Sequence, residues 1–279
     1  MNPIVSPLVR LADALTAGNA ADVFALLEPH AVCIVDGTTH SAHGVLQHWL
    51  PPHARAQLFV RRAFADADDP HWWAGEWVVR TSADGYAWQE IEQGVLLRMS
   101  GERIAWLRLH TDPSTQRLVR SNDPLRPEVL PTHVPAPHHV MSRAEKLAVH
   151  FRHTREGWAK GDAETVVSCH APQSLIQTPL EVVRGHEALR QAVKAYFENY
   201  ADTTIEVHHV VHNGIWFAVQ QTWTCTNRKT GVRASDQDLN IGIMQDGLFY
   251  RWREYYDSRT SAQTREQTVF GKETSDSVP

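Results

Sequence analysis

Residues 246–258 read DGLFYRWREYYDS, and the first half of the chain contains a counterpart, GERIAWLRLHTD, at residues 101–112. Both segments start at a glycine turn and continue to an arginine, Arg253 in one and Arg108 in the other. Other landmarks recur in the same order, and their offset stays between 140 and 146 residues. A nearly constant offset in a preserved order predicts a duplicated domain with small loop insertions.

The two copies are separated by a segment rich in proline. Residues 121–140 read SNDPLRPEVLPTHVPAPHHV, contain five prolines and show no apolar period, which is typical of an extended linker. The 279 residues suffice for two domains of ordinary size. We therefore predict a first copy at 1–118, a linker at 119–140, a second copy at 141–259 and a polar tail at 260–279.

Composition excludes several classes of partner. A net charge of -5 and a pI near 6.4 do not fit a protein that binds nucleic acid or an anionic membrane. The three cysteines are odd in number and widely spaced, so neither a disulfide framework nor a CxxC metal site is expected. No signal peptide and no run of about 20 apolar residues is evident. These features favour a cytoplasmic protein without membrane or nucleic-acid partners.

The second copy has the clearer pattern of elements. A capping box at 142–145 opens a helix that Gly161 ends, and Gly185 precedes another helix with an apolar stripe. The full prediction is three helices, with a strand at 175–178, followed by four antiparallel strands at 205–211, 215–226, 233–244 and 248–256. The first copy repeats this plan more loosely, and its third helix, at 45–50, is cut short by Pro51.

This order of elements, with its ending Asp-Gly-hydrophobic and Arg-Glu-Tyr-Tyr-Asp, resembles the nuclear transport factor 2-like superfamily. SnoaL-like polyketide cyclases, limonene epoxide hydrolase and ketosteroid isomerase are relatives of that kind. The resemblance covers nearly all of residues 142–258 and, through the duplication, about 6–113. It implies an α+β fold of two tandem cone-shaped domains, each with three helices on a strongly curved antiparallel or mixed sheet. It also implies a pocket in each cone and a pseudo-dimer in which the sheets pack together.

Strand alternation predicts which side chains of the second copy reach its pocket. The residues expected on the pocket face are Gln221, Trp223, Asp236, Asp238, Asn240, Trp252, Glu254 and Tyr256. Arg251 and Arg253 then point to the other face. Thr178 matches the position of the ketosteroid isomerase base, and of the hydrolase set only the last-strand acid remains, as Glu254. Both of those particular mechanisms are therefore not expected.

Three carboxylates, Asp236, Asp238 and Glu254, are expected to face one cavity. Like charges raise one another's pKa, so one acid could stay protonated while another acts as the base. The alternative is that Asp236 and Asp238 are solvated or paired with arginine. His208 and His209 are adjacent, so alternation places only one of them in the pocket, and His208 is the candidate.

These residues define the functional hypothesis. We expect a SnoaL-like enzyme of the isomerase, dehydratase, cyclase or hydrolase type, acting on a small organic substrate without cofactor or metal. The catalytic candidates are Glu254, Asp238, Asp236 and His208, and the substrate-binding candidates are Gln221, Trp223, Asn240, Thr178, Tyr256 and Trp252. The alternative is a non-catalytic ligand-binding or dimerisation protein of the same fold. A further homodimer stays open.

The first copy is expected to be chemically weaker. Glu90 and Glu92 are assigned to the positions of Asp236 and Asp238, but Leu109 stands where the second copy has Glu254. Any chemistry is therefore expected after residue 140.

Overall fold

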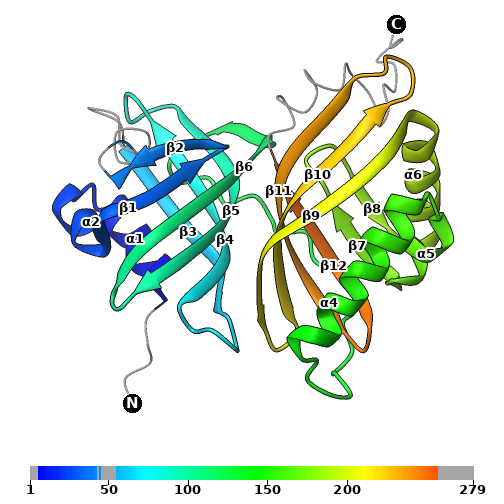
Figure 1. The fold of residues 1–279 in the computed structure, drawn as a ribbon. Helices are drawn as coiled ribbons and strands as arrows, with labels where there is room; N and C mark the ends of the chain where they lie inside the picture. Colours follow the sequence, from blue (N-terminus) through cyan, green and yellow to red (C-terminus); the bar gives the residue numbers. More distant parts are fainter. Residues whose placement is uncertain (1–5, 43, 45–54, 257–279) are drawn as a thin grey trace, which may run out of the picture.

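The computed structural model describes residues 6–42, 44 and 55–256, which form two α+β units, one from each half of the chain (Figure 1). Each unit has a six-stranded curved sheet with helices against one face. The fold class expected from the sequence, a tandem pair of cone-shaped domains, is confirmed. The part of the chain that the structure describes contains no helix long and apolar enough to cross a bilayer.

The second half forms a mixed sheet in the order β8-β7-β12-β11-β10-β9. Its elements are α4 (Arg143–Phe151), the π-helical turn η1 (Arg152–Gly157), the 3-10 turn η2 (Trp158–Lys160), α5 (Ala163–Ser168), β7 (His170–Gln177), β8 (Val182–Arg184), α6 (Gly185–Asn199), β9 (Tyr200–Asn213), β10 (Trp216–Asn227), β11 (Arg233–Gln245) and β12 (Leu248–Tyr255). The predicted four-stranded meander is present as β9 to β12, and two further strands complete the sheet. Strand β7 pairs in parallel with β12, through Ile176 and Trp252, and β8 extends the sheet. Local patterns do not reveal such parallel pairing between distant segments.

Local chemistry explains where the first helices of this half begin and end. The Ser142 hydroxyl accepts from the Glu145 amide and the Glu145 carboxylate accepts from the Ser142 amide, so the predicted capping box is confirmed. Gly161 ends η2 with φ 71°, a conformation that favours glycine. Asp162 then accepts from the amides of Glu164 and Thr165 and starts α5.

The first half repeats this topology in the order β2-β1-β6-β5-β4-β3. Its elements are α1 (Pro7–Thr16), α2 (Ala20–Leu26), β1 (Leu27–Val35), β2 (Thr38–Ser41), β3 (Arg55–Ala65), β4 (Trp72–Ser82), β5 (Trp88–Ser100) and β6 (Arg103–Val119). The sequence prediction missed β3, whose burial does not alternate clearly between buried and exposed residues. The helix predicted at 45–50 lies outside the described residues.

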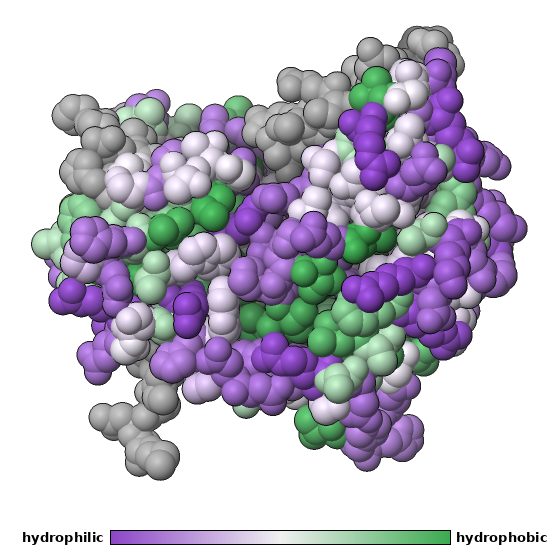
Figure 2. Space-filling model, in the orientation of Figure 1, coloured by the Kyte–Doolittle hydropathy of each residue, from purple (hydrophilic) through white to green (hydrophobic). Residues whose placement is uncertain are grey.

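The two sheets pack against each other by the faces that carry no helices (Figure 1). A shared apolar cluster fills the contact, with Phe64, Ala74 and Leu96 from the first sheet and Val211, Ala218, Leu239, Ile241 and Tyr255 from the second. On the face drawn in Figure 2 the surface is mainly hydrophilic, with hydrophobic residues gathered beside the junction of the halves. The predicted packing of sheet against sheet is therefore observed.

Polar contacts across the junction follow the internal symmetry. The Arg253 guanidinium donates to Glu92 at 3.0 Å, and Arg108, at the matching position of β6, donates to Gln237. Both arginines thus meet the equivalent strand of the opposite half. Such a reciprocal contact is the signature of an approximately two-fold interface.

Strand β6 ends at Val119 and α4 begins at Arg143. The intervening segment forms neither helix nor strand, yet it is bound to both halves. Arg61 donates to the Arg126 carbonyl at 2.6 Å, and Gln245 donates to the Pro135 carbonyl at 2.6 Å. The exact domain borders remain the prediction given above.

Candidate functional site

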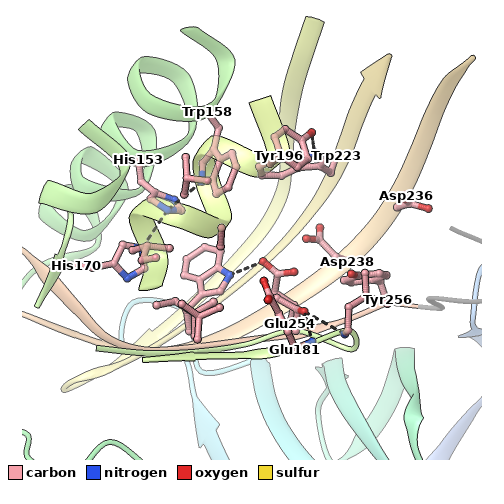
Figure 3. A pocket seen from close by; sticks show the side chains of 18 residues that line it. His153, Trp158, His170, Glu181, Tyr196, Trp223, Asp236, Asp238, Glu254 and Tyr256 are labelled. Carbon is pink, nitrogen blue, oxygen red and sulfur yellow. Dashed lines mark hydrogen bonds between the residues drawn. The ribbon is translucent and has the colours of Figure 1, made fainter. Parts of the chain in front are cut away.

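A cavity of about 110 Å³ lies in the second half, between its helices and the concave face of its sheet (Figure 3). Its walls are largely aromatic and aliphatic, and four carboxyl groups interrupt them. The lining residues are His153, Trp158, His170, Ile176, Thr178, Leu180, Glu181, Val183, Leu189, Ala192, Val193, Tyr196, Trp223, Asp236, Asp238, Trp252, Glu254 and Tyr256. An apolar cavity with a few converging polar groups is the usual form of a small-molecule site.

Most of the side chains proposed from the sequence meet at this cavity. Those that line it directly are Thr178, Trp223, Asp236, Asp238, Trp252, Glu254 and Tyr256. Gln221 and Asn240 do not line it but donate to Asp238 from the same face of the sheet. Arg251 and Arg253 point away, toward the first half, as alternation predicts.

Asp238 is the acid with the most unusual environment. It is only 5% exposed, and its Oδ2 accepts from Gln221 at 3.3 Å and from Asn240 at 3.1 Å. Burial, and then the negative charges of Glu254 and Asp236, raise the pKa of Asp238 well above its ordinary value of 3.8, against the lowering effect of the two amide donors. Its Oδ1 has no hydrogen-bond partner within the described residues, so this oxygen is the natural carrier of the proton.

Glu254 lies on the neighbouring strand. In the sheet register it pairs with Asn240, which makes it a diagonal neighbour of Asp238 on the same face. The Trp252 indole donates to Glu254 Oε1 at 2.8 Å, so the carboxylate is held by a neutral donor from its own strand. The negative charge of Glu254 adds to the effect of burial on the Asp238 pKa, so Asp238 is the acid that holds a proton.

Two histidines at the cavity were missed by the sequence analysis. His153 lies in the π-helical turn η1, and His170 begins β7. His153 Nε2 accepts from the Trp158 indole at 3.1 Å and lies 3.1 Å from His170 Nε2. His153 must therefore be protonated at Nδ1, and His170 must donate from Nε2.

Both of these histidines are neutral. Burial lowers the pKa of His170 to about 3, and it lowers the pKa of His153 well below 6.5, with a further contribution from His170 and His150. They are therefore hydrogen-bonding groups at neutral pH and not charged ones. The only sequence signal was the repeated His-Ala pair, at 30–31 and 170–171, which marks the duplication without indicating a pocket.

The sequence analysis also missed Glu181 and Tyr196. Glu181 follows Thr178 in the turn between β7 and β8, and burial raises its pKa. The Tyr196 hydroxyl, on α6, accepts from the Trp223 indole at 2.8 Å, and burial raises its pKa. Tyr196 therefore orients Trp223 as a wall of the cavity.

The structure does not bring His208 to the cavity. His208 is paired with Thr222 at 2.7 Å, on the opposite face of the sheet, and His209 packs against Trp72 of the first half with ring centroids 4.5 Å apart. The expectation that one of the two would face the pocket is wrong, because the register shifts between Gln220 and Gln221. A β-bulge adds one residue to β9 at this point and breaks the alternation.

At the corresponding positions the first half has buried residues other than carboxylates. Val95 pairs with Leu109 as Asn240 pairs with Glu254, and both apolar residues are fully buried. Counting from this pair assigns Gln93 to the place of Asp238, and Gln93 accepts from the Trp77 indole at 2.8 Å. The first half thus repeats the fold, with an amide, Gln93, at the place of Asp238 and an apolar residue, Leu109, at the place of Glu254.

The assignment of Glu90 and Glu92 to the positions of Asp236 and Asp238 is wrong. Glu90 binds Arg80 and Glu92 binds Arg253, on the sheet face away from the core of the first half. The error is one residue in register, and a slip of one residue moves every side chain to the other face.

One group of possible metal ligands exists among the described residues, formed by Asp66, Asp68 and His212 at the junction of the halves. Arg143 binds both carboxylates, and His212 Nε2 lies 3.0 Å from Asp68. These ligand atoms are therefore already engaged by a cation and a histidine. The arrangement is that of an ion-pair cluster.

Comparisons with known proteins agree with this architecture. Residues 136–252 match the model of the SnoaL-like domain. Similar solved structures include TsrD from Streptomyces laurentii (20% identity, 45% of this chain, 97% of that chain, TM-score 0.41) and an LEH-like epoxide hydrolase from M. tuberculosis (13%, 44%, 86%, 0.39). Another is an NTF2-like protein of unknown function from Burkholderia pseudomallei (14%, 46%, 100%, 0.41). The comparison with curated proteins gives no match.

The fold and the family match together define the class. Residues 136–252 of the second half match the SnoaL-like domain model, and the chain is a tandem pair of α+β units with the same order of strands in each sheet.

Proposed function

We propose that the second half is a cofactor-independent enzyme that moves protons on a small organic substrate, in the manner of an isomerase, dehydratase or cyclase. Asp238 is the acid and Glu254 is the base. The single observation that carries this proposal is the buried Asp238, whose Oδ1 lacks a partner among the described residues and whose raised pKa keeps it protonated.

The two acids have complementary roles, one as the base and the other as the acid. Glu254 removes a proton from a carbon beside a substrate carbonyl, and Asp238 gives its proton to the carbonyl oxygen, which leaves a neutral enol. The reverse transfers, with the proton returned to another carbon, complete an isomerisation with no net gain or loss of protons. A buried neutral carboxylic acid is a known device for stabilising such an oxygen.

The walls of the cavity suit a substrate with a flat apolar body. Trp158, Trp223 and Trp252 supply aromatic surface, and Thr178 and Tyr256 add polar groups beside the acids. We include Asp236 and the amide donors Gln221 and Asn240 in the site because they change the pKa of Asp238. Three free and buried cysteines agree with a reducing, cytoplasmic setting, which we propose on that ground.

Proton exchange tests the proposal without knowledge of the natural substrate. The full-length protein is incubated in D2O with a panel of small aryl and cyclic ketones, and deuterium incorporation beside the carbonyl is followed by NMR. Wild type is expected to accelerate exchange on some members, Glu254→Gln to abolish this acceleration, and Asp238→Asn to reduce it roughly 100-fold.

A matched control is Glu206→Gln, because Glu206 is an exposed acid on β9. It should exchange at the wild-type rate. If the panel binds in the cavity and no member exchanges faster than in buffer, the protein is a non-catalytic binder of the same fold and the proposal fails.

A further inference from the structure

Strand β12 serves two different surfaces with alternate residues. Trp252 and Glu254 face the cavity of the second half, while Arg251, Arg253 and Tyr255 face the first half. The three outward residues are almost fully buried, each 3% exposed or less. Any contact that fixes the outward residues therefore also fixes the base that lies between them.

Acids of the first half hold each of these outward residues. Arg251 donates to Glu76 at 2.9 Å, and the Tyr255 hydroxyl donates to the same carboxylate at 2.6 Å. Arg253 donates to Glu92 at 3.0 Å and to Asp112 at 2.5 Å. These acids, Glu76, Glu92 and Asp112, come from β4, β5 and β6. Three strands of the first half therefore hydrogen-bond to one strand of the second half.

The electrostatic environment strengthens the ion pair between Glu76 and Arg251. Burial alone would raise the pKa of Glu76, but Arg251 and Arg62 hold this pKa at about 2. Glu76 is therefore charged at all physiological pH values. Removing one partner of such a buried pair leaves an uncompensated charge, so the paired arrangement is strongly preferred over any other position of the strand.

We propose that the first half acts as a fixed clamp on β12, with Glu76, Glu92 and Asp112 as positioning residues for the base Glu254. This inference rests on the proposed function of Glu254. It gives the first half, which has Leu109 at the place of Glu254, a role in the site of the second. The sensitivity of proton transfer to misplacements of about 1 Å is the reason such a clamp matters.

The test compares three full-length variants of the first half. Glu92→Gln removes one partner of Arg253, and Glu92→Asp keeps the charge but withdraws the carboxylate by one methylene. Glu90→Gln is the matched control, because Glu90 is also buried on the same strand but binds Arg80 and Arg117 instead of β12. Folding of each is checked by circular dichroism and thermal melting.

The readout is the titration of Asp238, followed by carbon NMR of labelled aspartate side chains, together with the pH profile of ketone exchange. Displacement of Glu254 weakens its repulsion of Asp238, so both Glu92 variants are expected to lower the Asp238 pKa by about half a unit or more. Exchange should fall by about tenfold in kcat, with KM nearly unchanged. Glu90→Gln should change neither quantity, even if it lowers the melting temperature.

The outcomes separate the two proposals. A shift in both Glu92 variants without exchange in any protein supports the clamp and rejects the proposed reaction. A shift in Glu92→Gln alone reflects lost charge and overturns the clamp, as does an unchanged titration in both variants. Should Glu92→Gln fail to fold, Glu92→Asp decides the question against the same control.

Discussion

The Asn240 amide donates to Asp238 Oδ2 at 3.1 Å, although the two residues lie two apart on the same strand. Gln221 donates to the same oxygen from β10 at 3.3 Å. Two amides thus occupy one oxygen of the carboxyl group, and Oδ1 has no hydrogen-bond partner among the described residues. The proton of the neutral acid is therefore assigned to Oδ1.

Replacing Asn240 by leucine should raise the pKa of Asp238 further, because the amide hydrogen bond favours the ionised form. We expect a rise of about one unit in a carbon NMR titration of Asp238. Asn199→Leu is the control, since Asn199 is exposed at the end of α6 and its side-chain amide donates to the Ala195 carbonyl, far from Asp238 in the fold. An unchanged Asp238 titration in Asn240→Leu would mean that this amide does not act on the carboxyl group.

Asp238 should make the protein less stable as pH rises. Its pKa is higher in the folded state than in the unfolded chain, so the folded state binds the proton more tightly above pH 3.8. The stability gained from this proton is complete below about pH 3.8 and is lost as pH rises through the folded pKa.

Asp238→Asn removes this dependence, so the difference between wild type and variant in urea denaturation should grow in favour of the variant as pH rises above about 3.8. Asp202→Asn, at an exposed position near the start of β9, serves as the comparison. A constant difference across this range contradicts the protonated assignment.

His170 should have the opposite effect in acid. Its folded pKa of about 3 lies below the unfolded value of 6.5, so between these values the unfolded chain binds the proton and the folded protein does not. Stability is therefore expected to fall as pH drops from about 6.5 toward 3, by roughly 4 kcal/mol for this group. Thermal melts at several pH values measure this effect. His170→Phe serves as the variant whose stability lacks the contribution of His170 protonation.

A charge placed at Leu109 should be costly. Leu109 is fully buried at the place that corresponds to Glu254, and its neighbours in the first core are apolar. Leu109→Glu is expected to lose about 3 kcal/mol or more in urea denaturation, because no partner for a carboxylate is present in that core cluster. Leu118→Glu, at a position 77% exposed on the following part of the same strand, should change stability by less than about 0.5 kcal/mol.

Much of the candidate site was within reach of sequence reasoning, because it depends on alternation. Once β10, β11 and β12 were located, a period of two assigned Trp223, Asp238 and Glu254 to one face and Arg253 to the other. The same rule failed for His208, where a bulge inserts a residue, and for Glu92, where the register of β5 was counted one residue out. Neither a bulge nor a register leaves a reliable local signal in composition.

The amino-acid sequence by itself determined the duplication, most of the helices and strands of the second half, and the faces of β11 and β12 that carry acids. These are consequences of local patterns, such as the capping box at Ser142 and the strand ending at Glu254. Only the tertiary structure decided that His153 and His170 meet at the cavity, and that Glu92 accepts a hydrogen bond from Arg253 across the junction. Those contacts join residues that lie 17 and 161 positions apart, and which such residues meet depends on the packing of whole sheets and helices.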